Sequence, residues 1–265
     1  MHMRKVLALS LIMGLACDES GLAGSPHISL EVQDGGNSLL IQWYSVVGAD
    51  KYQLLVDSQV VYEGTDTSYT LNQPCRLIEC RAIGGNETSV DQEDLSAITD
   101  SVELWERDGE GVAAIGFTGT GAYTTYALSD TDSAHRAGFR FYLDDFRPDT
   151  IVLDSIRMVS SDFNGFGDPF NDCKALFAMW QDDSIPAPDT ASYQDKYSEI
   201  LLADSVYAVW LDVDANGWEE GHESDHFMKI KVLAAPDSTG KVVFRYWFQK
   251  VAGLRWVPVA PEEEN

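Results

Sequence analysis

Hydrophobic residues recur at every second position along several stretches of this chain. Leu39, Ile41 and Trp43 show this spacing early in the sequence, and residues 242–249 repeat it near the end. Because successive side chains of a β-strand point to opposite faces, the spacing predicts strands with one buried face and one solvated face.

The first part of the chain, residues 26–96, divides into short runs of this kind separated by turn sequences. Turn-forming residues gather at 34–37, 47–50 and 64–66. Short strands at such regular spacing are typical of an antiparallel β-sandwich, in which Trp43 is expected to be the central aromatic residue.

The same part of the chain resembles a fibronectin type III domain of the bacterial kind. The matching residues are Trp43, 47–52 (VGADKY), 65–71 (TDTSYTL) and 80–89 (CRAIGGNETS). The sequence departs from the family at Arg76, where a tyrosine usually begins a strand and forms the tyrosine-corner hydrogen bond. The resemblance implies a spacer or binding scaffold, and the fold alone specifies neither.

The rest of the chain, residues 99–260, is also rich in predicted strands, although we recognise no family there. The candidate strands are residues 102–106, 112–117, 123–128, 139–143, 151–159, 175–181, 206–213, 227–233 and 242–249. No long helical segments are available for parallel crossovers, so we expect a larger antiparallel sandwich or jelly roll. One short helix is predicted at 192–202, where Tyr193, Tyr197 and Leu201 follow helical spacing.

The predicted fold class is therefore all-β, with two β-sandwich domains. The acidic residues 91–94 are expected to form a solvated boundary between them, with few buried contacts.

The N-terminal residues resemble a bacterial lipoprotein signal. Arg4 and Lys5 precede an apolar run at 6–15, and Ala16 stands directly before Cys17. Gly14 and Leu15 occupy places where such signals usually have leucine and a small residue. The resemblance implies removal of residues 1–16, lipid attachment at Cys17, a tether at 17–25 and a membrane-anchored protein of the bacterial cell envelope, on its periplasmic or surface side. The alternative is an ordinary cleaved signal peptide beside a coincidental cysteine.

The charge of the chain argues against nucleic-acid binding, and the spacing of two cysteines argues against a disulfide between them. The 18 Lys and Arg residues face 43 Asp and Glu residues, giving a formal charge of −25 that would repel nucleic acid. A disulfide between Cys75 and Cys80 is not expected, because an extended segment between them would hold their Cα atoms too far apart.

An acidic stretch near the C-terminus matches a twelve-residue calcium loop. The expected oxygen ligands are Asp212, Asp214, Asn216, the Trp218 carbonyl, Glu220 through water, and Glu223. Gly217 occupies the sharp-turn position of that pattern. Because strands are predicted on both sides, the loop would connect a β-hairpin. The alternative is a metal-free hairpin that uses Asn216 and Gly217 as its turn.

No complete catalytic constellation is found, so we expect a non-catalytic binding or structural module with calcium as its cofactor. Its envelope protein or glycan partner is not specified by the sequence. One alternative is a calcium-dependent carbohydrate-binding module that uses Trp218. The other is a metal-dependent hydrolase, because His222, Glu223 and His226 match the zinc-peptidase spacing. That chemistry requires a helix, whereas a strand is predicted directly after the motif.

Overall fold

The computed structural model describes residues 21–129, 139–147, 151–161, 174–180, 186–188, 190–194, 196–212, 224–234 and 236–258. These residues form antiparallel β-sheets joined by loops and short 3-10 turns, which confirms the expected all-β class. No helix in this part of the chain is long and apolar enough to cross a bilayer.

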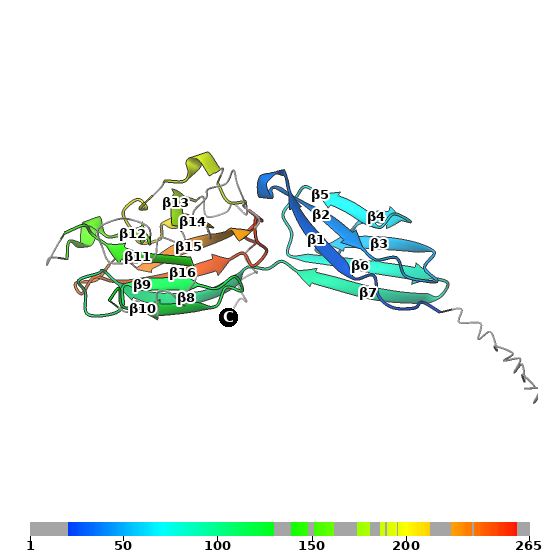
Figure 1. The fold of residues 1–265 in the computed structure, drawn as a ribbon, viewed down its shortest axis with the longest axis horizontal. Helices are drawn as coiled ribbons and strands as arrows, with labels where there is room; N and C mark the ends of the chain where they lie inside the picture. Colours follow the sequence, from blue (N-terminus) through cyan, green and yellow to red (C-terminus); the bar gives the residue numbers. More distant parts are fainter. Residues whose placement is uncertain are drawn as a thin grey trace, which may run out of the picture.

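The first sandwich contains β1–β7, and Figure 1 shows it beside the second along the long axis of the molecule. One sheet has the order β1-β2-β5, formed by Ile28–Gln33, Ser38–Trp43 and Ser68–Leu71. The other has the order β4-β3-β6-β7, formed by Gln59–Gly64, Lys51–Val56, Leu77–Gly84 and Glu87–Asp94.

The hydrophobic alternation predicts the core of this sandwich correctly. Leu39, Ile41 and Trp43 of β2 are buried, and they share one apolar cluster with alternate residues of β3. Cys75 and Cys80 are buried in the same cluster as free thiols, in agreement with the expectation that they form no disulfide.

The second sandwich contains β8–β16. Its larger sheet has the order β13-β14-β15-β16-β8, formed by Lys174–Met179, Val206–Asp212, His226–Ala234, Lys241–Phe248 and Ile98–Trp105. Its smaller sheet has the order β10-β9-β11-β12, formed by Tyr123–Tyr126, Ala114–Phe117, Phe139–Asp144 and Arg157–Ser160. The main core lies between these two sheets.

The larger sheet is also covered on its outer face. Every residue of β14 is buried, with Val209 and Leu211 in the main core and Trp210 in a second cluster on the opposite face. A strand buried on both faces needs an unbroken apolar run, which explains why residues 206–211 do not alternate with polar residues.

Two local expectations are wrong. No α-helix forms among the described residues of 192–202. Instead Gln194 forms a β-bridge with Phe177 of β13, and Ser198 donates its backbone N–H to the carbonyl of Met158 in β12. Pairing with these strands outweighs the helical spacing of the apolar residues. Likewise, only the end of the strand expected at 151–159 is regular, because the 3-10 turn η2 at Leu153–Ser155 precedes β12.

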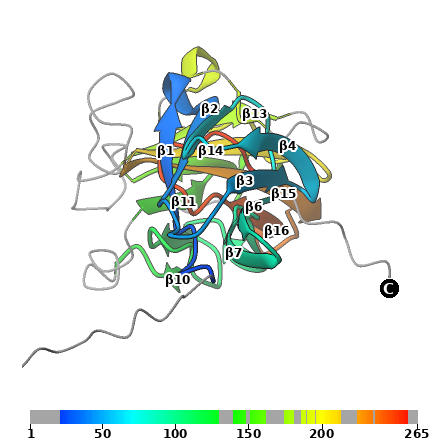
Figure 2. The ribbon, with the colours of Figure 1, turned by 90° about the vertical axis from the view of Figure 1, so that its right-hand side faces the viewer.

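The two sandwiches are joined more closely than the acidic boundary suggests. The acidic residues 91–94 end strand β7, and the connection to β8 is 95–97, where Leu95 and Ala97 are buried. The segment after β16 also returns to the first sandwich, and its Leu254 and Trp256 join that sandwich's core cluster. Figure 2, viewed from the first sandwich, shows the second directly behind it.

Candidate metal centre

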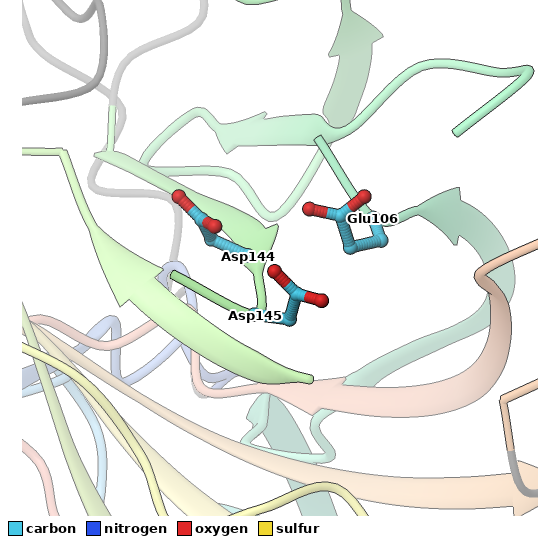
Figure 3. Close-up of side chains that lie close together, drawn as sticks. All are labelled: Glu106, Asp144 and Asp145. Atoms are coloured by element: carbon cyan, nitrogen blue, oxygen red, sulfur yellow. The ribbon is translucent and has the colours of Figure 1, made fainter. Parts of the chain in front are cut away.

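Three acidic side chains meet where the two sheets of the second sandwich come together. Glu106 directly follows β8 of the larger sheet, Asp144 is the last residue of β11 in the smaller sheet, and Asp145 follows it. Figure 3 shows the three side chains close together, with Glu106 across from Asp144 and Asp145. One oxygen from each lies within 4.8 Å of the others.

Backbone hydrogen bonds hold Glu106 in place. Its N–H donates to the Gly240 carbonyl at 2.8 Å, and its own carbonyl accepts the Gly109 N–H at 2.8 Å, closing a tight turn. The Arg107 N–H donates to the Leu143 carbonyl at 3.0 Å, which ties this turn to β11.

The two aspartates organise the turn after β11. Asp144 Oδ1 accepts the Phe146 N–H at 2.7 Å, and Asp145 Oδ1 accepts the Arg147 N–H at 2.8 Å. An aspartate that bonds the backbone two residues ahead is a standard turn former. Asp145 Oδ2 also accepts the Val152 N–H, so the side chain fastens both ends of the loop.

The triad is buried. Glu106 and Asp144 are 0% exposed and Asp145 is 3% exposed. The nearby cation is Arg107, whose Nη1 lies 3.0 Å from Asp144 Oδ2 and whose Nη2 lies 3.2 Å from Asp108 Oδ2. Glu106 Oε2 accepts the Asp108 N–H, but Glu106 Oε1 has no hydrogen-bond partner. Buried carboxylate oxygens normally have one, since an unpaired buried polar atom costs about 1–3 kcal/mol or more when charged.

This environment changes the acidity of two of the groups. Burial raises the pKa of Glu106 to about 7, against the opposing hydrogen bond from the Asp108 N–H and with the charges of Asp145, Asp108 and Asp144 adding to the rise. Burial also raises the pKa of Asp144, although the Phe146 N–H and Arg107 oppose the change.

The arrangement fits a hard divalent cation. Two oxygens on opposite sides of a calcium ion lie roughly 4.6–5.2 Å apart, because each is about 2.3–2.6 Å from the ion. The triad therefore has the spacing and donor type to bind a metal, and it joins both sheets of the sandwich.

The metal loop expected from the sequence is described only at its first residue. Asp212 ends β14, is buried and lies opposite Lys174 in the strand register. It does not belong to the acidic triad found among the described residues. The other expected ligands lie outside the described residues: Asp214, Asn216, Trp218, Glu220 and Glu223. The expected lipidation site, Cys17, lies outside them as well.

The residues of the hydrolase alternative are described only in part. His222 and Glu223 lie outside the described residues, and His226 begins strand β15. The His226 ring stacks on Phe248 with 4.9 Å between centroids, and its Nδ1 lies 2.9 Å from the Gln249 carbonyl oxygen. Burial lowers the pKa of His226, which favours a neutral ring.

The sequence reasoning missed the triad. The available signal was the pair Asp144 and Asp145 at the end of a strand of mainly large apolar residues, where charged residues must find partners. Their partner Glu106 is far away in sequence, and only the packing of the two sheets brings it near.

No protein-family model matches the chain, and a search of curated proteins finds no related sequence.

Proposed function

We propose that this protein is a non-catalytic module of the bacterial cell envelope whose second sandwich is stabilised by a calcium ion bound at Glu106, Asp144 and Asp145. The observation that carries the proposal is the buried, unpartnered Oε1 of Glu106, whose carboxylate lies beside two further buried carboxylates. A divalent cation would supply the missing partner and offset the repulsion among the three charges.

The ligand chemistry favours calcium. All three side chains offer oxygen, whereas structural zinc sites use mainly cysteine and histidine. Calcium accepts irregular coordination by loop residues, while magnesium demands a near-ideal octahedron. The three carboxylates are held in turns, two at the end of β11 and one after β8, and such loop residues suit the more tolerant ion.

Burial favours a structural role for the ion. A catalytic metal keeps an open position for substrate, but the three carboxylates of the triad are almost completely inaccessible. An ion there would connect the turn after β8 to the turn after β11, and hence one sheet to the other.

Export and membrane anchoring through Cys17 complete the proposal. They are supported by the basic residues, apolar run and small residue before that cysteine. The identity of the first sandwich as a fibronectin type III-like module is supported by its three-stranded and four-stranded sheets around Trp43.

The calcium proposal is tested by thermal unfolding of the purified protein across a calcium titration. Weak extracellular sites bind at about 10⁻⁴–10⁻³ M, and a hundredfold excess over Kd adds about 2.7 kcal/mol. We expect calcium to raise the melting temperature of the wild type, and Glu106→Gln to remove most of that rise.

Asp214→Ala is the matched control, because it removes a carboxylate from the sequence-predicted loop and leaves the triad intact. If Asp214→Ala abolishes the rise and Glu106→Gln does not, the ion binds the loop instead. A wild-type melting temperature indifferent to calcium up to about 10 mM, well above the range for weak sites, would remove the metal from the proposal.

The anchor is tested by Cys17→Ser. The variant should move from the membrane fraction to the soluble exported fraction and lose incorporation of a labelled fatty acid. Wild-type protein that takes up no label would contradict lipidation while leaving export open.

A further inference from the structure

We infer that residues 249–258, which follow the last strand of the second sandwich, are a structural part of the first sandwich and lock the two into one rigid body. The segment leaves β16 and crosses the junction. Its Leu254 and Trp256 are fully buried in the cluster that contains Leu39 and Trp43 of the first sandwich and Leu95 of the connection.

The backbones of the two sandwiches touch at this place. The Arg255 N–H donates to the Gly36 carbonyl at 3.1 Å. A Cβ atom added to Gly36 would lie 2.4 Å from the Gly253 carbonyl oxygen, closer than real Cβ atoms approach backbone. Gly36 also has a φ of +86°, a conformation that side chains rarely adopt. Contact this close resembles the interior of a domain and differs from a loose interface between domains.

Arg255 links three parts of the chain. Its Nη1 donates to Asn37 Oδ1 of the first sandwich at 3.1 Å, and its Nη2 donates to the Ala187 carbonyl of the second at 2.6 Å. The side chain is 5% exposed, so these bonds are screened from water.

Gln249 fixes the start of the segment. Its Oε1 accepts the Val251 N–H at 2.8 Å, and its Nε2 lies within hydrogen-bonding distance of the carbonyls of Trp256 and Leu95. At the other end, the Ala97 N–H of the connection donates to the Pro258 carbonyl at 3.2 Å. The segment is therefore held at both ends against the connection between the sandwiches.

This packing gives the segment a mechanical role. A flexible linker would let the second sandwich swing relative to the first. With a shared core, the same movement would require disruption of the core of the first sandwich. The first sandwich then depends for its stability on residues that follow the second in the chain.

The test is amide hydrogen exchange of the full-length protein, followed by mass spectrometry. Trp256→Ala should accelerate exchange in β2 and β5 of the first sandwich by about two to four orders of magnitude, given the usual effect of deleting a fully buried tryptophan. Lys250→Ala is the matched control, because that exposed side chain lies in the same segment, and it should leave β2 and β5 unchanged.

If Trp256→Ala does not yield folded protein, Leu254→Ala and Asn37→Ala apply the same test with smaller deletions from the two sides of the contact. Faster exchange in β2 and β5, with or without a change in the second sandwich, supports the lock. Faster exchange confined to β14–β16, with β2 and β5 as protected as in the wild type, would overturn it.

Discussion

At the scale of single residues, the three buried carboxylates of the triad differ in how many of their oxygens have hydrogen-bond or ion-pair partners. Both oxygens of Asp145 accept backbone N–H groups, and Asp144 has Arg107 and the Phe146 N–H. Only Glu106 keeps an oxygen without a partner. Glu106 is therefore the member whose ionisation costs most in the calcium-free protein, and the one that gains most from a cation.

Glu106 should make stability depend on pH in the calcium-free protein. Its pKa is raised from 4.5 to about 7, so over that range the folded state keeps a proton that the unfolded chain has lost. Stability should then fall as the pH rises from about 4.5 to about 7. The difference in free energy of unfolding between wild type and Glu106→Gln isolates this contribution, because other titrating groups such as His226 are common to both.

Saturating calcium should abolish that pH dependence above the range where protons compete for the site, because the ion keeps the carboxylate ionised in the folded state. A pH profile identical for wild type and Glu106→Gln without calcium would show that Glu106 ionises normally.

Removing the Arg107 side chain should increase the stabilisation that calcium gives to the protein. Arg107→Ala leaves the fully buried Asp144 without its cationic partner, which typically costs about 3–5 kcal/mol for a buried pair. Because the ion then meets less positive charge, calcium should raise the melting temperature of this variant more than that of the wild type. Arg81→Ala is the control, since its pair with Glu79 is more exposed and worth about 1 kcal/mol or less.

At the scale of elements, the turn between β8 and β9 positions Glu106 of the acidic triad. Gly111 packs on the Trp105 ring, and a Cβ there would lie 2.2 Å from the indole carbons. Lys241 Nζ lies 5.9 Å from the centroid of the same ring, so the indole is held from another direction. The turn that carries Glu106 has little freedom to move away.

Gly111→Ala should therefore displace this turn, costing about 1–3 kcal/mol as overpacking does and weakening calcium binding at the same time. Gly119→Ala is the control, because the nearest atom to its added Cβ would lie 3.5 Å away, an ordinary contact. Calorimetry and calcium titration of both variants would check the prediction. Equal calcium affinity in Gly111→Ala and the wild type would show that the position of this turn does not affect calcium binding.

Some of these elements are predicted correctly from the sequence and others are not. Strand alternation depends only on local pattern, so the buried faces of β2 and β3 are predicted correctly from Leu39 to Val56. Residues 193–201 have helical spacing, yet they pair with β12 and β13 because exposed strand edges offered backbone partners. A choice between local and distant hydrogen bonds cannot be read from spacing alone.

At the scale of the whole molecule, the acidic triad lies at the end of the second sandwich that is away from the first. β8 begins at the junction with the first sandwich and ends next to Glu106, so the triad lies at the end of β8 away from the junction. This placement could not be predicted from sequence, because it requires knowing that β8 and β11 belong to facing sheets. The acidic run at 91–94 also suggested a solvated boundary, but it is followed directly by the buried Leu95, and Leu254 and Trp256 reach the same cluster from beyond the second sandwich.

The reactivity of the buried thiols Cys75 and Cys80 reports how often the first sandwich opens. Burial raises the pKa of both Cys75 and Cys80 to about 12, so at pH 8 they should react with thiol reagents only after the first sandwich opens. In a Cys17→Ser, Cys173→Ser background, labelling should be slow for the folded protein and faster when Trp256→Ala is added. Rapid labelling of the folded background protein would contradict the burial of these thiols.

Strand β7 has one further consequence, for how copies of the protein behave toward one another. It is the outer strand of its sheet and carries Glu87, Asp91, Glu93 and Asp94 along its length. Like charges on an exposed strand repel the same strand of another molecule and so prevent edge-to-edge aggregation. Near pH 4 most carboxylates begin to take up protons. We therefore expect the solubility of the native protein to fall at about pH 4, before the pH is low enough to unfold the protein.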